Sequence, residues 1–199
     1  MMRRIRIGLW VLVGLAALAG VIIALRPMPA DRSIASSQSM FDVGGPFTLT
    51  GTDGKPFSSE RLAGKPFALF FGFTHCPDVC PTTLARLARL RTRLGKGDDA
   101  FAIVLVTVDP ERDTPAAMAR YAELFKTPVV ALTGTPAKIE GVKKQFGVSS
   151  AKVPQNGADY NVDHTATVFL IDSAGQFAAT ISPAEGDDAA LAKLGRMAS

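Results

Sequence analysis

The chain has 199 residues, of which 47% are hydrophobic and 20% charged, a composition that suits one globular domain with a complete core. Its formal net charge is +4, and the arginines in residues 1–26, a segment without acidic residues, account for all of it. Because the rest of the chain is neutral overall, the pI of about 9.3 does not indicate nucleic-acid binding, and we expect no nucleic-acid partner.

The first element in chain order is an uncharged apolar segment, residues 7–25, which follows Arg3, Arg4 and Arg6. As a helix, this segment is long enough to cross a hydrocarbon core of about 30 Å. The positive-inside rule keeps the arginines in the cytoplasm and exports the rest of the chain. We therefore expect residues 1–26 to form a single-pass anchor in the inner (cytoplasmic) membrane. A signal peptide cleaved after Ala19 is the alternative.

Residues 27–40 are rich in proline, serine and alanine and lack periodicity, which predicts a tether between the membrane and a periplasmic domain of residues 41–199. The order of elements in that domain predicts an α/β fold of the thioredoxin-like type, in which helices flank a central mixed sheet. The predicted elements are a hairpin at 47–57, a strand at 67–73, a helix from 81 to 94, a strand at 101–108, a helix at 115–125, a strand at 128–132, a helix at 136–146, a loop at 148–163 with room for a small hairpin, strands at 166–171 and 176–181, and a helix at 188–197.

The only two cysteines, Cys76 and Cys80, lie where the strand at 67–73 meets the next helix. Pro81 is typical of a first helical position, which predicts Cys80 as the N-cap and Cys76 in the preceding loop. Unpaired N–H groups and the positive end of the helix dipole would there favour thiolate over thiol. The Cys-x3-Cys spacing permits a redox-active disulfide or two thiolates facing one metal ion. An inert structural disulfide is disfavoured, because so short a loop gains little from closure.

Two thiolates alone bind a soft metal ion incompletely, so we expect a third ligand, and the only histidines are His75 and His164. His164 precedes a central-type strand, in the region where thioredoxin-type redox enzymes carry a cis-proline that faces the cysteines. No proline occurs between Asp159 and Thr180, which disfavours a general thiol-disulfide oxidoreductase and favours a Cys2His metal site. A histidine without a ligand role is the alternative for His164, and His75 is expected to point away.

Charged residues gather in two further places. Residues 109–113 predict either a structured loop that supports the site or docks a partner, or a solvated turn with capping acids. The arginines that follow the cysteines predict a solvated helix face; they are Arg86, Arg89, Arg91 and Arg93. Phe73 is expected in the strand core near the site. No Ser/His/Asp set or glycine-rich phosphate loop is present, so we assign no catalytic residue.

Three segments carry a resemblance to a known family. They are Gly72-Phe-Thr-His-Cys-Pro-Asp-Val-Cys-Pro81, Val108-Asp-Pro-Glu-Arg-Asp-Thr114 and Val162-Asp-His-Thr165, and they resemble the signatures of the Sco/SenC family. The likeness runs from about Phe41 to the C-terminus. Members of this family are thioredoxin-like copper-binding proteins that help to assemble the dinuclear copper centre of cytochrome c oxidase subunit II. The resemblance implies that Cys76 and Cys80 are thiolate ligands and that His164 is the imidazole ligand.

The expected metal is copper, as Cu(I) or Cu(II) or both, because two thiolates and an imidazole suit it, whereas structural zinc normally takes four protein ligands. Asp78 is a candidate accessory residue between the cysteines, and Asp163 is a candidate to orient the imidazole. We expect a membrane-anchored metallochaperone whose partners are cytochrome c oxidase subunit II and other periplasmic copper chaperones or thiol reductants. The alternatives are a thiol-disulfide reductase that keeps the copper-site cysteines of the oxidase reduced, and a copper or redox sensor.

Overall fold

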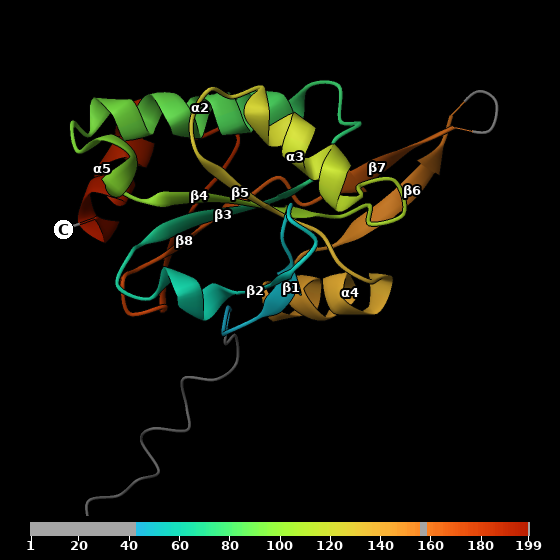
Figure 1. Cartoon of the computed structure of the whole chain (residues 1–199). Helices are drawn as coiled ribbons and strands as arrows, with labels where there is room; N and C mark the ends of the chain where they lie inside the picture. The colour runs from blue at the N-terminus through green and yellow to red at the C-terminus, as the bar shows by residue number, and fades with distance from the viewer. Residues whose placement is uncertain (1–42, 156–158, 199) are drawn as a thin grey trace, which may run out of the picture. The chain divides into compact units, whose positions relative to one another are not determined.

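The computed structural model describes residues 43–155 and 159–198, which belong to one compact unit, Asp42–Ser199 (Figure 1). The predicted anchor and tether, residues 1–40, lie outside the described residues. Within the described part of the chain, no helix is long and apolar enough to cross a membrane.

A five-stranded mixed sheet forms the centre of the domain, with strand order β5-β4-β3-β8-β9. The first three strands in this order are parallel, whereas β8 runs antiparallel to β3, and β9 runs antiparallel to β8. All residues of β3 and β4 are buried, as expected for continuous apolar runs covered on both faces. The bounds are β3 Phe67–Gly72, β4 Ala102–Thr107, β5 Val129–Leu132, β8 Val168–Ile171 and β9 Phe177–Ile181.

Helices cover both faces of this sheet, which confirms the predicted α/β arrangement (Figure 1). Helices α2 (Val79–Arg93), α3 (Pro115–Glu123) and α5 (Asp187–Met197) lie on one side, and the 3-10 turn η3 (Gly97–Asp99) follows α2. The other side carries α4 (Pro136–Gln145), the hairpin β1 (Thr48–Thr50) and β2 (Pro56–Ser58), and the 3-10 turn η2 (Ser59–Leu62). As predicted, a Thr-Pro pair begins both α3 and α4, because the threonine hydroxyl accepts a backbone N–H bond in each.

A second, two-stranded sheet projects from the domain next to the central sheet (Figure 1). It is the hairpin of β6 (Ser150–Pro154) and β7 (Tyr160–His164), which occupies most of the segment 148–163 predicted as a loop with room for a hairpin and extends one residue beyond it. The register pairs Ser150 with His164 at the base and Pro154 with Tyr160 near the tip. His164 is therefore the last residue of a hairpin strand, a few residues before β8 begins.

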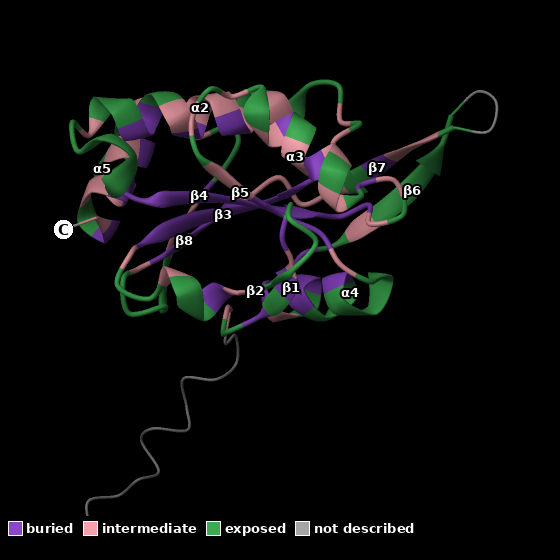
Figure 2. Cartoon of the chain, viewed as in Figure 1, coloured by how far each residue is buried: buried purple, intermediate pink, exposed green. Residues whose placement is uncertain are grey.

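The buried residues lie along the central strands and at intervals along the helices that cover them (Figure 2). Arg91 is a charged residue among these mostly apolar buried residues. Its burial corrects the prediction that the arginines of α2 form a solvated helix face. Its side chain is buried, donates to the carbonyl of Phe101 and pairs with Asp98 at 2.7 Å. A buried charge needs such partners, because it has lost its contact with water. The helical periodicity of α2 could not identify Asp98 and Phe101 as the partners, because both residues lie beyond the end of the helix.

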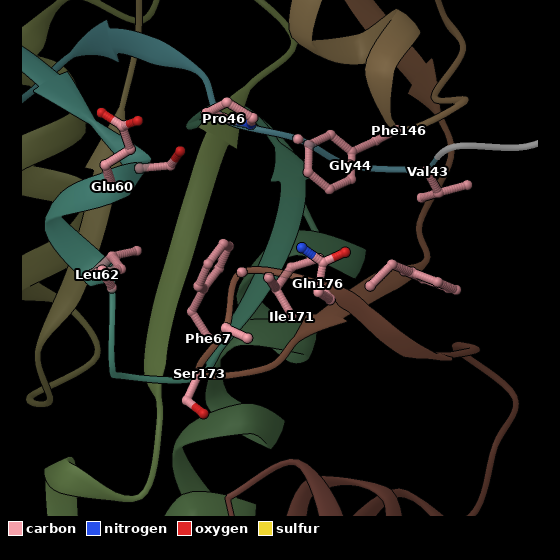
Figure 3. A pocket seen from close by; sticks show the side chains of 16 residues that line it. Val43, Gly44, Pro46, Glu60, Leu62, Phe67, Phe146, Ile171, Ser173 and Gln176 are labelled. Carbon is pink, nitrogen blue, oxygen red and sulfur yellow. The ribbon is translucent and has the colours of Figure 1, made fainter. Parts of the chain in front are cut away.

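A pocket of about 560 Å³ opens at the end of the sheet where β3 begins and β8 ends (Figure 3). Its lining includes Phe67 and Ile171 from these strands, Phe146 after α4, and Gln176 from the turn before β9. Because the cysteines follow the other end of β3, this pocket and the cysteine turn belong to opposite ends of the sheet.

Candidate metal centre

Two cysteines and one histidine converge at the end of β3. Cys76 lies in the loop after this strand, Cys80 in the first turn of α2, and His164 at the end of β7. Their sulfur and nitrogen atoms all lie within 4.8 Å of one another, and Cys80 Sγ is 3.5 Å from His164 Nε2. Both cysteines are free thiols. Among the described residues this is the only group of three or more such side chains close enough to share a metal ion.

The helix that carries Cys80 begins earlier than predicted. Asp78 is the N-cap and Val79 the first helical residue, so Cys80 and Pro81 are second and third rather than N-cap and first. Proline is tolerated there because the first four N–H groups of a helix have no partner within the helix. One of these groups, the N–H of Cys80, donates to Cys76 Sγ at 3.3 Å. The start of α2 thus supports the sulfur of Cys76 with a backbone donor.

Gly72, the last residue of β3, makes the close position of Cys80 possible. A β-carbon at this residue would stand 2.9 Å from Cys80 Sγ and 2.9 Å from Cε1 of Phe70. Both distances are shorter than van der Waals contact, so only glycine allows the buried sulfur to lie against the end of the strand. Gly72 was not among the predicted site residues. Its available signal was a glycine at the end of an otherwise apolar strand directly before the cysteine loop.

The electrostatics of Cys80 differ from the expectation that both sulfurs are thiolates. Burial, followed by the hydrogen bond with Cys76, raises the pKa of Cys80 far above that of an ordinary thiol, and a backbone hydrogen bond from Phe73 only partly opposes this. Desolvation outweighs the helix N-terminus here, because a thiolate that is fully buried loses its hydration. Cys80 is therefore protonated in the metal-free protein, and a metal ion must displace that proton to bind.

His164 presents one ring nitrogen to the cysteines. Nδ1 lies 3.1 Å from the carbonyl oxygen of Thr165, so Nδ1 carries the proton and donates, and the lone pair of Nε2 faces Cys80. Burial lowers the pKa of His164, against the raising effects of Thr165 and Asp163, which keeps the imidazole neutral near pH 7. The partner of Nδ1 is thus the Thr165 carbonyl, in place of the expected Asp163 carboxylate.

Two phenylalanines hold the imidazole ring in place. The rings of Phe70 and Phe73 each pack against His164 in an edge arrangement with centroids 5.9 Å apart. Phe73 was expected near the site, and its position confirms this. Phe70 and Gly72 belong to β3, and Phe73 follows directly. The end of this strand therefore shapes the site next to the sulfur of Cys80 and next to the imidazole of His164.

His75 and Asp78, although close to the cysteines in sequence, lie outside the three-residue group. The side chain of His75 is 54% exposed, and its Nδ1 lies 3.0 Å from the hydroxyl of Thr74. Asp78 is exposed, and its carboxylate accepts a hydrogen bond from the hydroxyl of Thr82 at 3.2 Å. In this structure Asp78 acts at the start of the helix, where a carboxylate suits the positive end of the dipole.

The charged residues 109–113 belong to a structured loop, residues 109–114, as one of the two interpretations predicted: the carboxylates of Asp109 and Asp113 are buried, whereas Glu111 between them is exposed. Asp113 is fully buried and its carboxylate accepts from the N–H of Thr74 at 3.1 Å and from its hydroxyl at 2.6 Å. The same carboxylate accepts from the hydroxyl of Thr107 at 2.6 Å. Thr74 precedes Cys76 by two residues, so Asp113 ties the cysteine loop to the end of β4.

The same loop also contacts the hairpin that carries His164. Arg112 pairs through Nε with Asp109, and its Nη1 donates to the carbonyl of Tyr160 at 2.9 Å. Its guanidinium lies 3.8 Å from the centroid of the Tyr160 ring, whose hydroxyl donates to Asp109 at 2.8 Å. Nothing in the sequence distinguished Tyr160, since its role depends on the fold bringing β7 to this loop.

The fold and the site together define a thioredoxin-like protein with a Cys2His group suited to a soft metal ion. A family model described as SCO1/SenC matches residues 35–199, and the chain belongs to this family. Over 155 residues the chain is 37% identical to the mitochondrial protein SCO2 of Saccharomyces cerevisiae, in a match that covers 76% of this chain and 52% of that protein. The chain therefore spans about half the length of this relative.

Solved structures give the same assignment. The copper-bound ScoI of Bradyrhizobium japonicum has 41% sequence identity and a TM-score of 0.70, and the match covers 78% of this chain and 99% of that one. BsSco, a member of the Sco family of cytochrome c oxidase assembly proteins in which a disulfide switch was identified, has 25% identity and a TM-score of 0.62. That match covers 80% of this chain and 94% of BsSco.

Proposed function

We propose that this protein binds one copper ion through Cys76, Cys80 and His164 and delivers it to the dinuclear copper centre of cytochrome c oxidase subunit II. The observation that carries the proposal is the convergence of two sulfurs and one imidazole nitrogen within 4.8 Å. The copper bound to the ScoI structure and the oxidase-assembly role given for the family of BsSco support it.

The donor set favours copper over zinc. Thiolate and imidazole together suit Cu(I), and Cu(II) can add a weak further ligand, whereas structural zinc takes four protein ligands. Among the described residues the group contains three ligand side chains. Copper is the cargo in this proposal. A coordination shell of only three protein ligands suits its transfer, because a ligand of the acceptor protein can bind the ion before any of the three ligands has left.

The accessibility of the three ligands gives the exchange a direction. Cys80 is buried, whereas Cys76 and His164 are both partly exposed, and Phe70 and Phe73 pack against the imidazole ring. A copper donor or acceptor thus approaches from the side of Cys76 and His164, and the buried Cys80 is the ligand that it reaches last. Residues 1–26 are proposed as the anchor that holds this domain at the periplasmic face of the inner membrane.

The test is copper stoichiometry on the reduced full-length protein, with His164→Ala beside wild type and His75→Ala as the matched control. We expect one tightly bound copper in wild type and in His75→Ala, because His75 lies outside the group. His164→Ala should bind copper at least tenfold more weakly, since it loses one of three ligands. Equal affinity in all three proteins would contradict the proposed site.

A thiol-disulfide reductase is the second candidate, because two free thiols lie close together and one of them is accessible. In that reaction Cys76 attacks an oxidised target as a thiolate, Cys80 resolves the mixed disulfide, and the target leaves with two thiols. A disulfide between Cys76 and Cys80 would then need an external thiol reductant. His164→Ala separates the two functions: a reductase keeps its exchange rate with an oxidised target peptide, whereas a chaperone loses copper transfer.

A further inference from the structure

We propose that the loop of residues 109–114 sets the position of His164 relative to the cysteine pair, with Arg112 and Asp113 as its positioning residues. This inference rests on the proposed copper site and identifies what determines its geometry. None of the three ligands belongs to this loop, and its effect on copper is therefore indirect. The loop holds the two halves of the site at once, the cysteine loop on one side and the hairpin β6–β7 on the other.

On the cysteine side, the attachment is a buried carboxylate. Asp113 receives two hydrogen bonds from Thr74 and one from Thr107, and all four side-chain and backbone groups involved are buried or part-buried. Because the N–H of Thr74 is one of the donors, the contact fixes the backbone two residues before Cys76. The cysteine loop therefore cannot move relative to residues 109–114 without leaving buried donors unpaired, which is costly.

On the histidine side, the attachment is the arginine. Arg112 donates to the backbone of Tyr160 and covers its ring, and Tyr160 in turn donates to Asp109. Tyr160 and His164 begin and end the same strand and project on the same face of it, because side chains alternate along a strand. A contact that fixes one end of β7 thus fixes the direction in which His164 points.

The hairpin depends on this contact because it lacks support from the central sheet. The strand partner of β7 is β6, and the two form a separate sheet that projects from the domain (Figure 1). The guanidinium of Arg112 also lies 5.9 Å from the centroid of the Phe73 ring, which packs against the ring of His164. Arg112 therefore acts on His164 through the strand backbone and through Phe73.

The consequence for copper depends on its oxidation state. The two thiolates supply most of the binding of Cu(I), with the imidazole as a third ligand, whereas Cu(II) has a stronger requirement for the imidazole nitrogen. If His164 is held less firmly, Cu(II) affinity falls more than Cu(I) affinity, and the reduction potential of bound copper rises. A loss of stability alone would weaken both oxidation states alike and would leave the potential unchanged.

Arg112→Met tests this, because the methionine keeps an apolar side chain on Tyr160 and removes the charge and the donors. Arg86→Met is the control: Arg86 is 15% exposed against 18% for Arg112, and each arginine donates to a backbone carbonyl and pairs with aspartate, Arg86 with Asp187 and Arg112 with both Asp109 and Asp159. For Arg112→Met we expect one bound Cu(I) per chain, as in wild type. We expect the ratio of Cu(II) affinity to Cu(I) affinity to fall about tenfold, which raises the reduction potential of the bound copper by about 59 mV.

Two further variants keep the test meaningful if Arg112→Met folds poorly. Tyr160→Phe removes only the hydroxyl that reaches Asp109, so it should change the potential and the thiolate-to-Cu(II) absorption band in the same direction by a smaller amount. Arg112→Lys keeps the charge and should restore part of the wild-type potential. In the metal-free protein, amide hydrogen exchange along β7 should be faster in Arg112→Met than in wild type or Arg86→Met.

The decisive measurement is a double-mutant cycle with His164→Ala. Because Arg112 is proposed to act through His164, Arg112→Met should shift the potential in the wild-type background and have no further effect once His164 is alanine. An equal shift in both backgrounds, an equal shift in Arg86→Met, or no shift at all overturns the inference while leaving the copper site intact. A wild-type protein that binds no copper would instead overturn the proposed function and this inference with it.

Discussion

The substitution Gly72→Ala gives the most direct test of how the sulfur of Cys80 is accommodated. The added methyl group would stand 2.9 Å from Cys80 Sγ, 2.9 Å from Phe70 Cε1 and 3.3 Å from Leu105 Cδ1. All three neighbours are fully buried, so none can move into solvent to relieve the overlap. The side chains must shift inside a packed core, and one of the two nearest, Cys80, is a proposed metal ligand.

The expected magnitude follows from two opposing effects. Overpacking of a core costs about 1–3 kcal/mol, and replacing glycine by alanine at an ordinary φ returns about 0.4–1 kcal/mol through the unfolded chain. We expect a net loss of roughly 1–2 kcal/mol in the free energy of unfolding, which lowers Tm by roughly 2–8 °C for a domain of this size. Copper affinity should fall as well, because Cys80 Sγ moves away from His164 Nε2.

The assay is urea denaturation of the reduced, metal-free protein together with a copper titration. Gly141→Ala is the matched control, because Gly141 is exposed in α4 and a β-carbon there meets no atom within 4 Å. That variant should gain about 0.5–1 kcal/mol from the helix and bind copper normally. If Gly72→Ala is as stable as wild type and binds copper equally well, the argument for a close contact between β3 and the sulfur is wrong.

Three further results are expected. Because burial lowers the pKa of His164 below the value of about 6.5 in an unfolded chain, its contribution to stability is present above that pH and is lost as the pH falls through the folded pKa. Urea denaturation at pH 7.5 and 5.0 should therefore show a larger acid loss for wild type than for His164→Gln. Alkylation of the reduced protein at pH 8, followed by peptide mass spectrometry, should label Cys76 before Cys80, because Cys80 is buried and its pKa is raised; equal rates would contradict the burial. Asp113→Ala should cost about 2–4 kcal/mol, since it leaves several buried donors unpaired, whereas Glu111→Ala, which breaks an exposed pair with Lys152, should cost less than about 1 kcal/mol.

The sequence predicted most of the fold because its signals were local. Apolar runs predicted β3 and β4, and the Thr-Pro pairs predicted where α3 and α4 begin. The grouping of the two cysteines with His164 came from chain order together with the family resemblance, since spacing alone left the role of His164 open. The structure brings these three side chains together, as that reasoning expected.

What the sequence could not predict depends on contacts between distant segments. The helix N-terminus indicated a thiolate at Cys80, but the burial that reverses this arises from β3, β4 and α2 packing together. The arginine face of α2 looked solvated because periodicity does not reveal that Asp98 and Phe101 lie over Arg91. Tyr160 and Arg112 meet across 48 positions of sequence, and no local pattern marks either as a support for the site.

The separation of 84 positions between Cys80 and His164 has a consequence for the order in which the site is made. At roughly 5–20 residues per second, the two cysteines leave the ribosome about 4–17 s before the histidine does. The central strand β3 also waits for β8, its antiparallel partner, which follows His164 in the chain. During synthesis the cysteines thus exist first as an unshielded dithiol, and the nitrogen ligand joins them only when the sheet closes.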